Sequence, residues 1–166
     1  RKNDSISISL VTHDKKGIPM THDFIYHNPT KVYFGNGMLA HLPEEISRLG
    51  SRVLLITGGS SAKKSGLFDK VLAEISKANV DCYGLSGVKP NPEISLVREG
   101  IRLVREKRLD LILALGGGSV LDTAKVIAGS APYDADPWDL IRSHAAIDTA
   151  LPLITIPTIA ATGSEM

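Results

Sequence analysis

Three consecutive glycines, Gly116, Gly117 and Gly118, stand between an apolar run and a polar segment in LALGGGSVLDTAK (113–125). Backbone amides at a helix N-terminus have no partner within the helix and carry partial positive charge. Because glycine has no Cβ, a diphosphate can approach such amides closely. The segment therefore predicts a phosphate cradle between a buried strand and the start of a helix.

Two polar side chains follow the glycines, and the residues alone leave two roles open for them. Ser119 can cap the helix or donate its hydroxyl to a phosphate oxygen. Asp122 lies three residues further on, which is the spacing of a capping box. Helix capping and ligand binding are compatible, so both interpretations stand.

Two better-known nucleotide-binding patterns are incomplete in this sequence. The dinucleotide pattern G-x-G-x-x-G requires a glycine at position 121, where the chain has Leu121. The segment GGSSAKKS (58–65) nearly matches the P-loop, but Lys63 stands where the second glycine belongs. We therefore exclude a nucleoside triphosphatase.

Composition narrows the class of protein. The chain has 166 residues, 43% hydrophobic residues and a net charge of +1, which suits one domain with a real core. The even spread of basic residues argues against nucleic-acid and membrane-surface partners. The single cysteine, Cys82, cannot form an internal disulfide and is expected in the core of a cytoplasmic protein. No apolar run approaches the ~20 residues of a membrane span.

Strand and helix patterns alternate along most of the chain. Apolar runs predict strands over 52–57, 80–85, 110–115 and 151–158, and helical spacing predicts helices over 38–50, 65–79, 91–108 and 119–131. This alternation is typical of an α/β fold with an open, mainly parallel sheet and helices on both faces. We also expect a short N-terminal β element within 24–34. Residues 1–22 are expected to form a flexible arm, and residues 23–166 the domain.

The small polar residues of this chain fall where the predicted strands end. Gly58 and Gly59 follow the run 52–57, the three glycines follow 110–115, and Thr158 and Thr162 follow the last strand. Ligands of open parallel sheets bind beyond the carboxyl ends of the strands. The sequence therefore predicts that these loops form one site.

Several segments, in order, resemble the iron-containing (group III) alcohol dehydrogenase family, which shares its fold with dehydroquinate synthase. They are NPTKVYFGNG (28–37), KPNPE (89–93), LALGGGSVLDTAK (113–125), DPWDL (136–140) and TIPTIAATGSEM (155–166). The resemblance runs from about residue 24 to the end of the chain, and is nearest to the NADP-using butanol dehydrogenase and aldehyde-reductase-like branch. It implies the NAD(P)-binding domain of an enzyme that interconverts small alcohols and aldehydes.

The resemblance also implies roles for individual residues. In the family the glycine block holds the cofactor pyrophosphate, here Gly116, Gly117, Gly118 and Ser119, with Asp122 near the nicotinamide. A threonine-rich segment lines the cofactor cleft, here Thr155, Thr158 and Thr162, together with Ser164.

The first loop after a strand faces the adenosine ribose in this family. In this chain the loop consists of Gly58, Gly59, Ser60 and Ser61. It lacks the aspartate that many NAD-preferring members carry, and Lys63 and Lys64 follow it, so NADP(H) is favoured over NAD(H). The two lysines can equally be a solvated helix start, and Lys125 can match the family lysine or hold its own helix.

The metal site of the family has no counterpart in this sequence. Family members are roughly twice this length or more, and their ligands, one aspartate and three histidines, follow the T-G-S-E motif. We expect Fe or Zn only in a longer parent protein, and assign no metal ligand and no catalytic residue within 1–166. The isolated chain would then be inactive. The five histidines are expected at surface or packing positions: His13, His22, His27, His41 and His144.

Two other functions fit the same residues. One is a non-catalytic module that binds a nucleotide or serves in assembly, and the other is a lyase of the dehydroquinate synthase type, which uses NAD and zinc.

In the isolated chain, the face that would pack on the metal-binding domain of the family is exposed, and the segment 151–162 ends there. We therefore expect dimerisation or poor solubility of the isolated chain, and a homo-oligomer for the protein.

Overall fold

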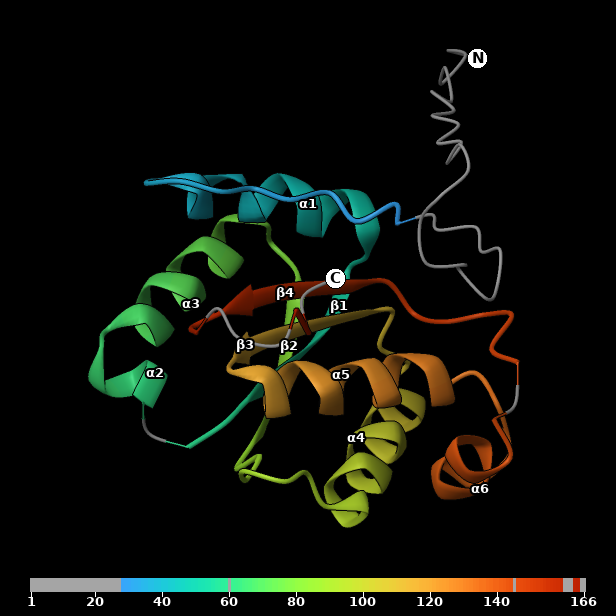
Figure 1. Cartoon of the computed structure of the whole chain (residues 1–166). Helices are drawn as coiled ribbons and strands as arrows, with labels where there is room; N and C mark the ends of the chain where they lie inside the picture. Colours follow the sequence, from blue (N-terminus) through green and yellow to red (C-terminus); the bar gives the residue numbers. More distant parts are fainter. Residues whose placement is uncertain (1–27, 60, 145, 160–162, 165–166) are drawn as a thin grey trace, which may run out of the picture. The chain divides into compact units, whose positions relative to one another are not determined.

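The computed structural model describes residues 28–59, 61–144, 146–159 and 163–164 (Figure 1), without the side chains of Ser61 and Lys63. The chain divides into two units, Arg1–Thr30 and Lys31–Met166, and the fold below is that of the second. The arm expected over 1–22 and residues 24–27 of the expected β element lie outside the described residues.

A parallel sheet of four strands forms the centre of this unit. The strands are β1 (Arg52–Thr57), β2 (Asp81–Ser86), β3 (Leu111–Gly116) and β4 (Leu153–Pro157). Their order is β2-β1-β3-β4, and every neighbouring pair is parallel. The predicted α/β class and all four predicted strands are confirmed, with ends shifted by one or two residues.

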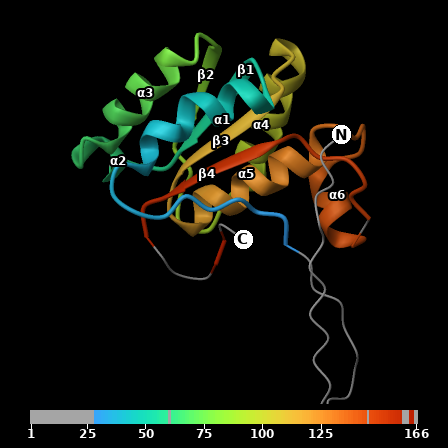
Figure 2. The same ribbon diagram turned by 90° about the horizontal axis from the view of Figure 1, so that it is seen from above.

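Helices cover both faces of the sheet, so that the unit has three layers (Figures 1 and 2). The helices α1 (Leu42–Leu49) and α3 (Leu67–Lys77) pack on one face, and α4 (Ile94–Lys107) and α5 (Gly118–Ser130) on the other. Residues of β1 and β3 alternate between the two layers and are almost all buried. This burial explains why both strands have continuous apolar sequences.

Three short helices complete the described part of the chain: η1 (Met38–His41), α2 (Ser61–Lys64) and α6 (Pro137–Arg142). Helix α6 begins at Asp136, whose carboxylate accepts a hydrogen bond from the Trp138 amide at 2.9 Å. The Arg98 guanidinium of α4 binds the same carboxylate at 2.8 Å. Arg98 therefore ties α6 to α4.

Two expectations about the sheet are wrong. Residues 31–34 are not a strand, so the described residues contain no short N-terminal β element. Cys82 lies in β2 and is exposed rather than in the core. Because β2 is an edge strand, most of its residues keep access to solvent.

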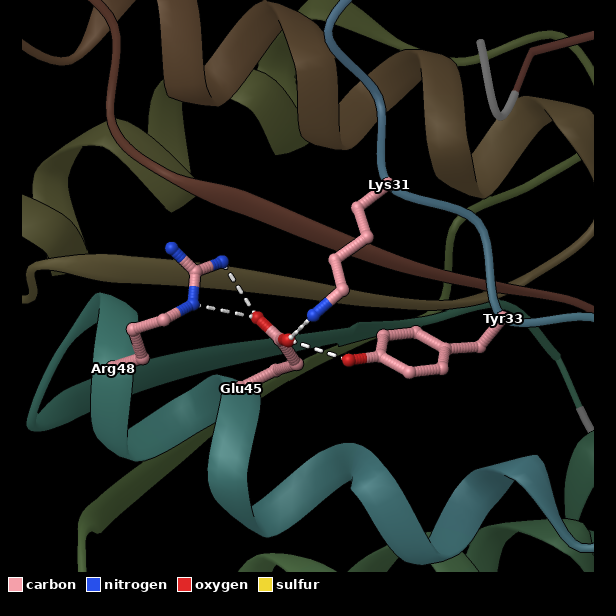
Figure 3. Close-up of polar contacts among 4 residues, drawn as sticks. All are labelled: Lys31, Tyr33, Glu45 and Arg48. Carbon is pink, nitrogen blue, oxygen red and sulfur yellow. Dashed lines mark hydrogen bonds and ion pairs between the residues drawn. The ribbon is translucent and has the colours of Figure 1, made fainter. Parts of the chain in front are cut away.

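Glu45 explains the conformation of residues 31–34. This carboxylate of α1 is almost buried, with its side chain 11% exposed. Its Oε1 accepts hydrogen bonds from Lys31 Nζ at 2.5 Å and the Tyr33 hydroxyl at 2.6 Å, while Arg48 Nε and Nη2 bind Oε2 (Figure 3). Polar and apolar residues alternate in this segment as they would in a strand, but the polar ones, Lys31 and Tyr33, bind Glu45. The apolar residues Val32 and Phe34 are exposed.

The pKa of Glu45 is lowered from 4.5 to about 2, chiefly by the hydrogen bond from Lys31. A carboxyl group with a lowered pKa in the folded state stabilises the protein above its unfolded pKa and loses that effect as the pH falls through its folded pKa. We predict that Glu45→Gln lowers the free energy of unfolding most above pH 5, and that the difference from the wild type shrinks towards pH 2.

Urea unfolding followed by circular dichroism at several pH values measures this difference. Glu44→Gln is the matched control, because Glu44 is the exposed neighbour in the same helical turn. A Glu45→Gln difference that is equal at pH 3 and pH 7 would contradict the role assigned to the ionised carboxylate.

Candidate functional site

The carboxyl ends of β1 and β3 lie side by side in the middle of the sheet. From β1 the chain proceeds to β2 on one side, and it then returns to β3 and β4 on the other side. Such a reversal opens a crevice beyond the strand ends, where open α/β sheets bind their ligands. Gly58 follows β1 and Gly117 follows β3 at this crevice.

Backbone hydrogen bonds hold the loops of the crevice together. The amides of Gly87 and Val88, which follow β2, donate to the carbonyls of Gly58 at 3.4 Å and Thr57 at 3.3 Å. On the other side, the Thr158 amide donates to the Gly116 carbonyl at 2.9 Å. The loops after β1 and β2 are therefore linked on one side of the crevice, and those after β3 and β4 on the other.

The N-terminus of α5 points its free amides into this region. Gly117 is the N-cap residue in an extended conformation, and no side chain of the described residues caps the helix. The first amides bonded within the helix are those of Val120 and Leu121, both to the Gly117 carbonyl. The preceding amides, of Gly118 and Ser119, lie in the first turn, where no intrahelical acceptor exists. Such a terminus attracts an anion.

The capping-box interpretation of Ser119 and Asp122 is wrong. Ser119 is the second residue of α5 and not its cap, and Asp122 is exposed in the fifth helical position. The helix starts one residue earlier than the pattern suggests, because Gly117 itself adopts the cap conformation. The Ser119 carbonyl accepts a hydrogen bond from Thr123 Oγ1 at 2.8 Å.

The glycines of the crevice differ in what surrounds them. A Cβ on Gly117 or Gly59 would meet no heavy atom of the described chain within 4 Å. In contrast, a Cβ on Gly116 would lie 2.5 Å from Val120 Cγ2, and one on Gly58 would lie 3.2 Å from the same atom. Gly58 and Gly116 are thus needed for packing, whereas Gly59 and Gly117 leave room for a ligand.

Two of the other predicted site residues belong to β4 or directly follow it. Thr155 is half-buried in β4 and pairs with Ala114, and Thr158 follows that strand. Ser164 is half-buried. Ser60, Thr162 and the side chain of Ser61 lie outside what the structure describes.

Sequence reasoning missed the apolar floor of the crevice. Val120 and Val88 are buried beneath the glycine loops. The only indication in the sequence is a valine directly after the G-G-G-S segment, which is indistinguishable from any apolar residue of a helix.

The described residues offer little for metal binding or nucleophilic chemistry. No three His, Cys, Asp or Glu side chains among them are grouped so that they could hold a metal ion, and we derive no chemical step through one.

His41 stacks on Tyr33 with ring centroids 4.8 Å apart, and His144 is exposed, whereas the other three histidines are not described. Although Cys82 is exposed, neighbouring protein atoms keep some water from its thiol and raise its pKa, which disfavours the reactive thiolate. None of the described helices is long and apolar enough to cross a membrane.

Several known proteins are similar to this chain in sequence and in fold. Probable NADH-dependent butanol dehydrogenase 1 of Bacillus subtilis is 47% identical over 144 residues, which cover 87% of this chain and 37% of the relative. NADPH-dependent aldehyde reductase of Escherichia coli is 40% identical over 147 residues, again 87% of this chain and 37% of the relative. This chain thus spans little more than a third of the length of these relatives.

The solved structure of NADH-dependent butanol dehydrogenase A from Thermotoga maritima superposes with a TM-score of 0.81 at 40% identity. The superposition covers 85% of this chain and 36% of that one. Residues 29–166 match the family described as iron-containing alcohol dehydrogenase. The chain belongs to the iron-containing alcohol dehydrogenase family.

Proposed function

We propose that this chain binds NAD(P) across the carboxyl ends of β1, β3 and β4, as the cofactor-binding part of an enzyme that interconverts small alcohols and aldehydes. The observation that carries the proposal is the uncapped N-terminus of α5, with open space beside Gly117. Unbonded amides together with a helix dipole favour the pyrophosphate of a dinucleotide.

Different segments of the crevice would bind different parts of the cofactor. The amides of Gly118 and Ser119 would hold the pyrophosphate, and the loop that begins at Gly58 and Gly59 would face the adenosine ribose. On the opposite side of α5 the nicotinamide half would extend towards β4. The residues proposed for that half are Asp122, Thr155, Thr158 and Thr162. The bound nicotinamide would supply the hydride acceptor or donor.

Cofactor choice depends on the loop after β1. Relatives of this chain include proteins named as NADH-dependent and as NADPH-dependent. We propose NADP(H) as the preferred form, because the loop 58–61 has no carboxylate to repel a 2′-phosphate and lysines follow it. NAD(H) is the alternative, and parallel titrations with NADPH and NADH decide between them.

An oxidoreductase is favoured over a lyase and over a module without catalytic function. The relatives compared above are named as dehydrogenases and reductases. Small alcohols or aldehydes are therefore the proposed substrates of the whole protein, with a divalent metal held by residues outside this chain. We also propose that the whole protein is a homo-oligomer.

Gly117→Ala tests the phosphate cradle. The glycine has φ −85° and ψ −175°, which alanine tolerates, so the fold should persist while the added methyl group occupies the approach to the amides. We predict about tenfold weaker binding of NADPH, since loss of one amide hydrogen bond to a charged phosphate costs roughly 1.5 kcal/mol or more, with a change in Tm of less than about 2 °C. Fluorescence titration and thermal unfolding measure the two effects.

Gly129→Ala is the matched control, because it introduces the same methyl group into the same helix, at an ordinary 3.6 Å contact with Ile147. Equal NADPH affinity for the wild type and Gly117→Ala would show that the dinucleotide does not use this helix N-terminus. If the wild-type chain binds neither NADPH nor NADH, the proposed function itself is wrong.

A separate prediction concerns turnover. We expect the 166-residue chain to bind NAD(P)H without oxidising 1-butanol, even with added Fe²⁺ or Zn²⁺, because no described cluster can hold a metal that would stabilise the alkoxide. Absorbance at 340 nm in the presence of NADP⁺ or NAD⁺ measures the reaction. Metal-dependent production of NADPH or NADH by the chain alone would overturn the proposal that the metal is held by residues outside this chain.

A further inference from the structure

We propose that Val120 is a positioning residue, whose side chain sets the distance between the loop after β1 and the N-terminus of α5. This inference rests on the proposed cofactor site, because those two segments would hold the adenosine and pyrophosphate portions of one dinucleotide. Val120 itself would touch neither portion, since it is buried beneath the glycines and only 4% exposed.

One methyl group of Val120 lies close to both glycine loops. Val120 Cγ2 lies 3.2 Å from the position of a Cβ on Gly58 and 2.5 Å from that of a Cβ on Gly116. Each of these distances is shorter than an ordinary van der Waals contact of a side-chain carbon. The backbone after β1 and the backbone after β3 therefore both pack against the same methyl group.

The loop after β2 closes the packing around Gly58 from another side. The Val88 carbonyl lies 3.6 Å from the position of a Gly58 Cβ, and the Val88 amide donates to the Thr57 carbonyl. Gly58 is thus enclosed between Val88 and Val120. Any shift of the Val120 side chain is transmitted to the backbone that leads into Gly59.

Val120 is well suited to hold a fixed spacing. Its amide donates to the Gly117 carbonyl at 2.9 Å, so its backbone is anchored to the cap of α5. A β-branched side chain in a helix has one strongly preferred χ1 rotamer. The methyl group therefore has a defined position relative to the free amides of Gly118 and Ser119.

Val120→Ala removes this methyl group together with Cγ1 and tests the proposal. We expect NADPH to bind about tenfold more weakly, since the two segments are then less preorganised for the dinucleotide. Val97→Ala is the matched control: Val97 has the same 4% exposure and belongs to the same core cluster, but it lies on α4. It should lose comparable stability while binding NADPH within about twofold of the wild type.

A size exchange separates positioning from simple loss of packing. Gly58 does not have a positive φ, so alanine is conformationally allowed there once Val120 Cγ2 is absent. Gly58→Ala alone would press its new methyl group against Val120 and weaken binding. In the double variant Gly58→Ala/Val120→Ala the new methyl group takes the place of Cγ2, one of the two methyl groups removed, and we expect affinity to recover to within about threefold of the wild type.

Fluorescence titration with NADPH at 10 °C, together with thermal unfolding of each variant, completes the test. Equal losses of affinity in Val120→Ala and Val97→Ala, or a double variant as weak as the product of the two single effects, would overturn the positioning role. A wild-type chain that binds no dinucleotide would instead refute the proposed function. In that case strictly additive effects of the two substitutions on Tm would refute the shared contact as well.

Discussion

The close approach of α5 to the ends of β1 and β3 is the constraint on which the rest of this structure depends. Val120 lies between two strand ends that are tied together by the sheet, and only glycine fits at Gly116 beside it. This packing brings the first turn of α5 to the point where the strand order reverses. A helix N-terminus in that position is favourable only if its free amides are solvated or bound to an anion.

The described part of the site consists of backbone rather than of titratable side chains. Its donors are the amides of Gly118 and Ser119, and its shape comes from the glycines on either side. Such a site can hold and orient phosphates. The arrangement therefore suits cofactor binding, which is the role proposed for this chain.

Much of this fold could be predicted from the sequence, because its strongest features are local. The continuous apolar runs of β1 and β3 indicate strands buried on both faces, and the helical spacing of Val97, Ile101 and Val104 indicates one covering helix. The glycine loops at the strand ends could be placed by the same reasoning. In contrast, the alternation in residues 31–34 was misleading, because Lys31 and Tyr33 bind Glu45 instead of joining a sheet.

The errors share a physical cause. The environment of Cys82 depends on the position of β2 at the edge of the sheet, and the start of α5 on the extended backbone conformation of Gly117, which its residue type does not specify. The role of Val120 could not be predicted either, since it arises from two glycines that are 58 residues apart in the sequence, at positions 58 and 116, and meet around one methyl group.

The central claim is that a dinucleotide binds at the N-terminus of α5. Amide chemical-shift mapping of the ¹⁵N-labelled chain during titration with NADPH tests it most directly. The account predicts that the largest shifts occur at Gly59, Gly117, Gly118 and Ser119. Shifts concentrated instead around the cavity on α4 would contradict it, because the phosphates would then bind without any contribution from the glycine loops. That cavity is lined by Arg98, Arg102 and Arg105 together with Glu106, Asp134 and Asp136.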